Sequence, residues 1–286
     1  MSCARGSRPA TTRGRRPEQQ VTADGVRLDA ELVRRGFARS RSQAREAVAE
    51  GRVRVAGVAA LKPGQRVAPN AALELREADP WVARSAHKLN AALEAFDIPV
   101  TGRLCLDIGA STGGFTQVLL GHGARTVIAL DVGHDQLVPE LRDDRRVLVV
   151  EGANARELDR TRLTAWSGTD ERPELVVVDV SFIPLALILP GVAAVLAPGG
   201  SVVALVKPQF EVGRAGVREG LVRDRSRRQD AARRVLAAAH AAGLGIHGVL
   251  DSPIVGSRGN REYLIWLTAE LAGDPTQWET RVASLL

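Results

Sequence analysis

Lysine is the rarer basic residue of this 286-residue chain, and two lysines stand where they could do chemistry. Of 39 basic residues, only three are lysine: Lys62, Lys88 and Lys207. Lys62 lies in a polar Lys-Pro-Gly turn, which explains its presence without any chemistry. An amine can lose its proton when it is desolvated or placed near other cations, whereas a guanidinium effectively cannot. Lys88 and Lys207 are therefore candidates for a general base.

Two carboxylates complete a candidate catalytic set with these lysines. Asp179 directly follows an apolar segment, and Glu262 stands at the start of another. A neutral lysine amine can take the proton of a weakly acidic hydroxyl group as that group attacks. We assign Lys207 as the base and Asp179 as the residue that orients it. Lys88 would then orient the hydroxyl group, and Glu262 would balance the charge of Lys88 and fix its position. These roles could be exchanged within the set.

The segment 104–115 has the pattern of a nucleotide-cofactor cradle. An apolar strand runs into a Gly/Ser/Thr turn and then into an apolar-periodic helix. Glycines let the backbone approach a ligand, and a helix start offers free N–H groups. The glycine spacing departs from that of pyrophosphate-binding dehydrogenases, and an acid at the strand end suits a cationic ligand. The predicted cofactor contacts in this segment are Asp107, Gly109, Ala110, Ser111, Gly113, Gly114 and Phe115.

The next two strand ends supply further polar side chains. Asp131 lies roughly 20 residues beyond Gly109, where a carboxylate can accept both hydroxyl groups of a ribose. Asn154 follows the third strand and could contact an adenine amine, although an amide at such a place is often only a loop cap. Together these features predict a site for S-adenosylmethionine. The alternative is an ordinary strand–turn–helix connection with a solvated aspartate.

Strands and helices alternate along most of the chain. Strands are predicted at 103–108, 126–130, 147–150, 175–178, 201–206, 244–250 and 263–268, after a helix at 84–96. This alternation predicts an α/β fold with a doubly wound, seven-stranded, mostly parallel sheet, Rossmann-like as in class I S-adenosylmethionine-dependent methyltransferases. Function is then expected at the carboxyl ends of the strands.

The order of the candidate catalytic residues carries a resemblance. Lys88, Asp179, Lys207 and Glu262, in these strand contexts, resemble the tetrad of FtsJ-like ribose 2'-O-methyltransferases. The resemblance implies methyl transfer to a ribose hydroxyl group, helped mostly by in-line positioning of oxygen, methyl carbon and sulfur. Each of the four residues taken alone could instead be a surface or ion-pair residue. Phe210 could stack on a base, but such a residue is more often part of the core.

Residues 26–75 form a smaller predicted unit. Helices are expected at 28–35 and 41–49, with a serine N-cap before the second, and strands at 52–55 and 67–75. The motifs Arg27-Leu28-Asp29, Ser40-Arg41-Ser42-Gln43 and Gly51-Arg52-Val53-Arg54 resemble the S4 RNA-binding fold. The resemblance implies RNA contacts by Arg27, Arg39, Ser40, Arg41, Gln43, Arg45, Arg52 and Arg54. The alternative is a solvated basic hairpin that only aids solubility.

These patterns predict a division of the chain. We expect a disordered basic extension at 1–24, a small α+β S4-like domain at 25–78, a linker at 79–83, a methyltransferase domain at 84–272 and a tail at 273–286. Trp81 in the linker could wedge between the domains. Because the folded pattern begins near Val26, a native translation start at Val21 is a hypothesis.

Charge and composition narrow the partners. The net charge of +6 and pI of about 10.2 favour a polyanion, and arginines far outnumber carboxylates over residues 1–54. The front of the chain is therefore the predicted nucleic-acid contact. No apolar run approaches membrane-spanning length, and neither the two cysteines nor the scattered histidines indicate a disulfide or a metal site. We expect a cytoplasmic protein without membrane or metal partners.

The domain order resembles the TlyA family of ribosomal RNA cytidine 2'-O-methyltransferases, also named haemolysin A. The resemblance implies ribosomal subunits as substrates, either both or the large one alone, and predicts no oligomeric state. Asp79-Pro80 replaces the more basic approach expected before Trp81, which puts a cofactor-coupling role of the linker in doubt. A non-enzymatic RNA-binding protein and a haemolysin-like membrane-active protein remain as alternatives. The complete set of four candidate catalytic residues counts against the first, and the absence of an apolar span counts against the second.

Overall fold

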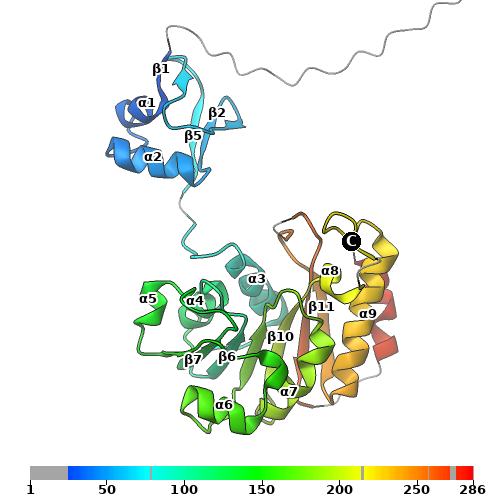
Figure 1. Cartoon of the computed structure of the whole chain (residues 1–286). Coiled ribbons are helices and arrows are strands. Elements are labelled where there is room, and N and C mark those ends of the chain that lie inside the picture. Colours follow the sequence, from blue (N-terminus) through cyan, green and yellow to red (C-terminus); the bar gives the residue numbers. More distant parts are fainter. Residues whose placement is uncertain (1–24, 78, 214–215, 257, 271–274, 286) are drawn as a thin grey trace, which may run out of the picture. The chain divides into compact units, whose positions relative to one another are not determined.

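The computed structural model describes residues 25–77, 79–213, 216–256, 258–270 and 275–285. The expectations about residues 1–24, including a start at Val21, lie outside these ranges. Between Pro80 and Trp81 the chain divides into two compact units, the first ending at Pro80 and the second running to the end of the chain (Figure 1).

The first unit is a small α+β domain. Its elements are β1 (Val26–Arg27), α1 (Leu28–Arg34), α2 (Arg41–Ala49), β2 (Val53–Val55), β3 (Val58–Ala59), β4 (Arg66–Val67) and β5 (Leu73–Leu75). The strands form a two-stranded sheet, β1-β4, and a three-stranded sheet, β3-β2-β5. Apolar residues spaced three and four apart on both helices, among them Leu28, Leu32, Ala44 and Val48, pack with the strands into one core.

The strand expected at 67–75 is wrong, and the short strand β3 was not predicted. Residues of that segment belong to two strands, β4 and β5, which lie in different sheets. A turn separates them, closed by a hydrogen bond of 2.9 Å from Ala71 N to Ala68 O. Pro69 lies inside this turn, and proline cannot donate a ladder hydrogen bond. The alternation of apolar residues therefore runs through this turn, and it suggested one long strand where the structure has two short ones.

The second unit contains the predicted sheet. Its strands are β6 (Leu104–Ile108), β7 (Thr126–Leu130), β8 (Val147–Val150), β9 (Leu175–Val178), β10 (Ser201–Val206), β11 (Gly245–Asp251) and β12 (Tyr263–Thr268). Their order is β11-β12-β10-β9-β6-β7-β8. The strand β12 pairs antiparallel with β10 and β11, and the other pairings are parallel. The prediction of a doubly wound, seven-stranded, mostly parallel sheet is confirmed, with its switch point between β6 and β9.

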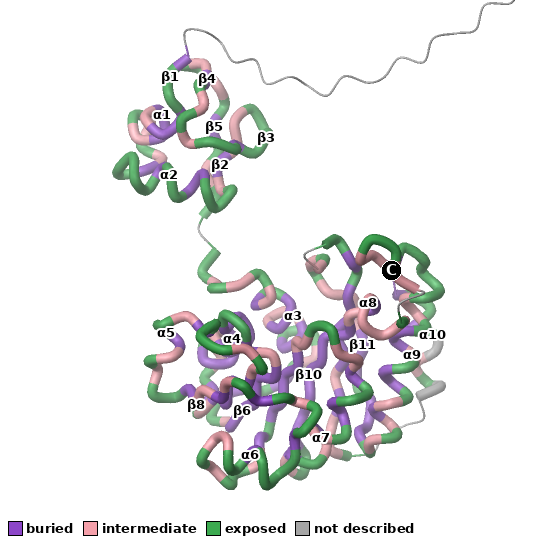
Figure 2. Tube along the Cα trace, in the orientation of Figure 1, coloured by how far each residue is buried: buried purple, intermediate pink, exposed green. Residues whose placement is uncertain are grey.

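Helices cover both faces of this sheet. They are α3 (Ala86–Phe96), α4 (Gly114–Gly121), α5 (Pro139–Arg142), α6 (Arg160–Ser167), α7 (Leu189–Val195), α8 (Pro208–Glu211), α9 (Arg225–Ala241) and α10 (Glu279–Ser284), with short 3-10 turns η1 (Ala155–Glu157), η2 (Leu185–Leu187) and η4 (Pro275–Trp278). Successive strand residues alternate between two apolar clusters, one against α3 and α4 and one against α7 and α9. The central strands β6, β9 and β10 are accordingly buried along their length (Figure 2). Trp81 packs against the cluster of α3 and α4.

Candidate active site and nucleic-acid interface

Lys207 and Asp179 form an ion pair at the carboxyl ends of neighbouring strands. Lys207 directly follows β10 and Asp179 directly follows β9, and these strands pair in parallel. The Nζ atom of Lys207 lies 2.7 Å from Oδ1 of Asp179, and both side chains are largely buried. The same Nζ atom donates a hydrogen bond of 3.0 Å to Oγ of Ser181. The structure thus brings Lys207 and Asp179 together, and their roles as base and orienting carboxylate stay a prediction.

Lys88 and Glu262 form a second, deeper ion pair. Nζ of Lys88, on α3, lies 2.6 Å from Oε2 of Glu262, which precedes β12. The two side chains are 9% and 3% exposed. Burying a charge in this way is costly unless an opposite charge accompanies it. The structure thus brings Lys88 and Glu262 together as a buried ion pair, and their roles in catalysis stay a prediction.

Three of these four residues line a cavity of about 540 Å³. Lys88, Lys207 and Glu262 share its wall with Ser181, Phe182, Gln209, Phe210, Arg84, Arg258 and Asn260, among others. Phe210 lines this cavity and belongs to neither core cluster of the second unit. The centroid of its ring lies 5.0 Å from that of Phe182.

Phe182 was missed in the sequence. Its side chain is 84% exposed, and its φ of +65° is unusual for a residue with a large side chain. A strained, exposed aromatic residue beside buried charges is characteristic of a functional site. Its place three residues after Asp179, in a turn following a buried strand, was the signal that could have found it.

A second cavity of about 510 Å³ opens at the ends of β6, β7 and β9. Four of the predicted cofactor residues line it: Gly109, Ser111, Asp131 and Asn154. The carboxylate of Asp131 accepts hydrogen bonds from Ser111 N at 2.9 Å and Gly133 N at 2.7 Å. Since each carboxylate oxygen has two acceptor sites, both oxygens keep capacity for a ligand. Asn154 Oδ1 accepts from Arg156 N at 3.1 Å, so this residue is both a loop cap and part of the cavity wall.

The glycines of this loop allow close packing, and the remaining residues predicted from it do not line the cavity. Gly109 has φ of +88°, and a Cβ atom there would lie 2.4 Å from the carbonyl oxygen of Asp179. A Cβ atom on Gly114 would lie 2.5 Å from Ser85 Oγ, so this glycine lets the segment before α3 approach α4. Ala110, Gly113 and Phe115 are likewise absent from the residues that line the cavity. Phe115 belongs to the core cluster and is 3% exposed.

Asp107 lies fully buried at the end of β6. Thr116 Oγ1 donates a hydrogen bond of 2.7 Å to its Oδ2, while Oδ1 has no partner among the described residues. Burial above all, together with the nearby carboxylates of Asp179 and Asp131, raises the pKa of Asp107 to about 7, although the hydrogen bond from Thr116 lowers it. Asp131 and Asp179 at the neighbouring strand ends, and Asp107 once it is ionised, give this region negative charge. A cationic ligand in the adjoining cavity would suit it.

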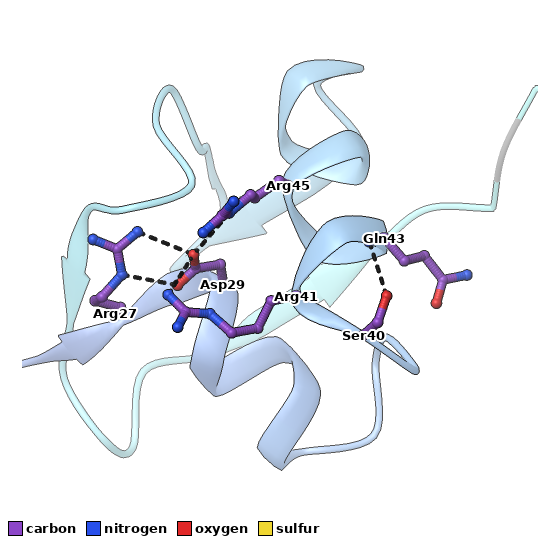
Figure 3. A network of polar contacts seen from close by, with 6 residues as sticks. All are labelled: Arg27, Asp29, Ser40, Arg41, Gln43 and Arg45. Atoms are coloured by element: carbon purple, nitrogen blue, oxygen red, sulfur yellow. Dashed lines mark hydrogen bonds and ion pairs between the residues drawn. The ribbon is translucent and has the colours of Figure 1, made fainter.

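On the first unit, three arginines converge on one buried carboxylate (Figure 3). Arg27 donates to Asp29 from Nε and Nη2 at 3.1 and 3.0 Å, Arg41 from Nη2 at 3.0 Å and Arg45 from Nε at 3.3 Å. Asp29 is fully buried, whereas the arginine side chains are 49–56% exposed. Hydrogen bonds from the arginines, that of Arg27 foremost, hold the pKa of Asp29 well below its usual range. We call Arg27, Arg41, Arg45 and Asp29 the arginine cluster.

The other predicted RNA contacts have local roles in the structure. Ser40 begins α2, and its Oγ accepts from Gln43 N at 3.2 Å. Gln43 Oε1 accepts in turn from Arg39 N at 2.8 Å. Arg52 bonds to a neighbouring glutamate at 2.5 Å, and Arg54 lies within β2. The structure therefore gathers three of the eight residues at one place and uses Ser40, Gln43 and Arg52 in local contacts.

Two kinds of site are absent from the described ranges. No helix in them has the length and apolar character needed to cross a membrane. In the same ranges, no group of three or more His, Cys, Asp or Glu side chains is placed to hold a metal ion.

Comparison with known proteins matches both units. The family model of FtsJ-like methyltransferases matches residues 81–269, and the S4 domain model matches residues 26–73. The chain is 50% identical over 251 residues to the 16S/23S rRNA (cytidine-2'-O)-methyltransferase TlyA of Mycobacterium tuberculosis, covering 86% of this chain and 90% of that protein. It is 38% identical over 240 residues to Hemolysin A of Brachyspira hyodysenteriae, covering 84% and 98%. A solved structure described as a hemolysin from Streptococcus thermophilus has a TM-score of 0.69 at 39% identity, over 91% of this chain and 94% of that one.

Proposed function

This chain belongs to the TlyA family of FtsJ-like methyltransferases with an S4 domain, and from that premise we propose that it methylates the ribose 2'-hydroxyl group of cytidine in ribosomal RNA. The observation that carries the proposal is the pair of lysine–carboxylate contacts, Lys207 with Asp179 and Lys88 with Glu262, at one end of the sheet. The cytidine of ribosomal RNA is the substrate named for the M. tuberculosis relative.

The cavity beside Asp131 suits S-adenosylmethionine. Asp131 would accept the ribose hydroxyl groups and Asn154 would contact the adenine, since both line this cavity. The negative region formed by Asp107, Asp131 and Asp179 would favour a ligand that carries positive charge. When bound, S-adenosylmethionine supplies a methyl group on a positively charged sulfur.

The larger cavity would receive the target nucleotide. Lys207, in its neutral form, would take the 2'-hydroxyl proton onto Nζ, and Asp179 would stabilise the ammonium group that results. Lys88 would donate a hydrogen bond to the attacking oxygen, kept charged and in place by Glu262. The faces of Phe182 and Phe210 offer a stacking surface for a base taken out of its helix.

The arginine cluster, which belongs to the other unit, would bind RNA backbone phosphates. Its guanidinium groups are fixed on one side by Asp29 and half exposed on the other. We propose the RNAs of both ribosomal subunits as substrates, because the match to the 16S/23S enzyme of M. tuberculosis covers 90% of that enzyme. Ribosomal RNA as substrate implies a cytoplasmic location.

The test is methyl transfer to unmodified ribosomal subunits. The protein and its Lys207→Ala variant are incubated with tritiated S-adenosylmethionine, and the RNA is digested to nucleosides. We expect label in 2'-O-methylcytidine with the unaltered protein and its loss in the variant. Label on a base atom would contradict the assignment of the four residues, and absence of label would favour a non-enzymatic RNA-binding protein.

A further inference from the structure

We propose that Ser181 is a positioning residue that directs the Nζ lone pair of Lys207 toward the target hydroxyl group. This inference rests on the proposed function, because it concerns the same base. The evidence is that Lys207 Nζ donates a hydrogen bond of 3.0 Å to Ser181 Oγ, whereas its contact of 2.7 Å with Asp179 Oδ1 is an ion pair that is not aligned as a hydrogen bond. Neither the family resemblance nor the candidate set of four includes Ser181.

Hydrogen-bond partners of an amine nitrogen determine where its lone pair points. Besides Cε, the nitrogen has three tetrahedral positions, which an ammonium group fills with three protons. A neutral amine has two N–H groups and one lone pair. Ser181 accepts one N–H group and the charge of Asp179, 2.7 Å away, attracts the other, so the lone pair of Lys207 occupies the third position. With Asp179 alone as partner, the amine could rotate about its Cδ–Cε and Cε–Nζ bonds and turn the lone pair elsewhere.

The surroundings support a role in geometry and not in stability. Ser181 is exposed, and in the described part of the chain its hydroxyl group has no other hydrogen-bond partner. It lines both cavities, as does Phe182, so it stands where cofactor and nucleotide would meet. The charged residues that share the larger cavity with Lys207 are Lys88, Glu262, Arg84 and Arg258.

The turn that carries Ser181 is closely held. The carbonyl oxygen of Asp179 would lie 2.4 Å from a Cβ atom at Gly109, so only glycine at that position allows this packing. Directly after Ser181, Phe182 has a φ of +65°. A hydroxyl group on a turn fixed in this way can set a direction for the amine that reaches it.

The alternative role for Ser181 is a direct contact with the cofactor, because it also lines the cofactor cavity. The two roles predict different kinetics. A positioning residue acts on the transfer step and lowers kcat, whereas a binding contact that is equally strong before and during the reaction changes KM.

The test compares Ser181→Thr with Ser181→Val, which have the same shape and differ in the hydroxyl group. Rates are measured on unmodified ribosomal subunits as a function of pH, with KM for RNA and for S-adenosylmethionine and a melting curve for each variant. We expect Ser181→Thr to keep kcat within about 3-fold and Ser181→Val to lose about 10-fold, the equivalent of one hydrogen bond. KM should be unchanged in both.

The pH profile adds a readout that a structural defect would not move. The hydroxyl oxygen supports the ammonium form more than the neutral amine, because hydrogen bonds from a charged donor are stronger. In Ser181→Val the pH of half-maximal kcat should therefore fall relative to Ser181→Thr. Equal kcat and pH profiles for the two variants would overturn the proposal, as would a raised KM for S-adenosylmethionine at unchanged kcat. If the unaltered protein formed no 2'-O-methylcytidine, the proposed function itself would fail, and this inference with it.

Discussion

The two units each contain an aspartate with no exposed surface, and they treat it in opposite ways. In the first unit Asp29 bonds to three arginines, which hold its pKa well below the usual range. In the second unit Asp107 bonds to the hydroxyl group of Thr116 and has carboxylates nearby, and burial raises its pKa to about 7. The first unit thus compensates its buried charge internally and turns cations to the solvent. The second gives its buried aspartate a neutral partner, and a cationic ligand in the nearby cavity would favour the ionised carboxylate.

The two sites also differ in the type and the exposure of their basic residues. The arginine cluster consists of groups that stay charged at any physiological pH, half exposed and pinned to Asp29. The candidate active site uses Lys88 and Lys207, buried and each paired with one carboxylate. Arginine suits a fixed contact with phosphate, and lysine suits a step in which a proton moves. The predictions below test this division.

The largest effect on the rate of methyl transfer should come from replacing the candidate base Lys207 with arginine. In Lys207→Arg the ion pair with Asp179 can persist, but guanidinium cannot act as a base. We expect the rate of methyl transfer to fall at least about 100-fold, the usual contribution of general base catalysis. Binding of RNA and of S-adenosylmethionine, measured by filter retention and calorimetry, should stay within a few-fold. A variant with more than a tenth of the normal rate would show that Lys207 is not the base.

Breaking the deeper ion pair should reduce stability as well as activity. Glu262→Gln leaves the Lys88 ammonium group buried without its counter-charge. We expect a loss of about 3 kcal/mol in the free energy of unfolding, measured by denaturant titration.

A double variant separates stability from chemistry at this pair. In Lys88→Met with Glu262→Leu no buried charge remains, so stability should return toward its normal value while methyl transfer stays low. Recovery of activity together with stability would mean that the pair has only a structural role.

In the first unit, removing a negative charge should weaken binding to a polyanion. Asp29→Asn makes the unit more positive, which by charge alone would strengthen RNA binding. Because it releases three arginines from their fixed positions, we expect RNA affinity to fall about 5-fold instead, the equivalent of roughly one hydrogen bond. The measurement is RNA affinity as a function of salt concentration.

The matched control is Glu31→Gln, on the same helix. Glu31 is as buried as Asp29 and bonds to Arg34 and Arg35, but Arg35 also donates to the carbonyl oxygen of Ala71 at 2.7 Å. Its loss should lower the melting temperature without weakening RNA binding. Equal losses of RNA affinity in the two variants would indicate that unfolding, and not the arginine cluster, explains the Asp29 result.

Asp107 should make the stability of the second unit depend on pH. Since its pKa is raised to about 7, the folded protein holds this proton more tightly than the unfolded chain. The resulting stability is fully present below about pH 4 and is lost as the pH rises through about 7. Asp107→Asn does not titrate, so its melting temperature relative to the unaltered protein should rise by roughly 10 °C between pH 4 and pH 8. A constant difference would mean that Asp107 does not change protonation in this range.

The sequence alone determined the architecture of the second unit. Its strands are short apolar runs buried on both faces, and the prediction placed them to within a residue or two of β6–β12. Polar residues at their carboxyl ends were then candidates by position, because parallel strands bring those ends to one edge. The same local reasoning failed at 67–75, where an alternating pattern passes through the turn at Pro69 and joins two sheets.

Tertiary structure alone decided which of the candidates meet. Lys88 and Glu262 lie 174 residues apart, and their contact depends on how α3 and β12 pack, which no local pattern contains. The choice of Ser181 as second partner of Lys207, the exposure of Phe182 and the convergence of three arginines on Asp29 are of the same kind. Periodicity reports which face of an element is buried, because burial repeats along a helix or strand. Distances between side chains of different elements depend on packing, and there the chemistry of this protein is set.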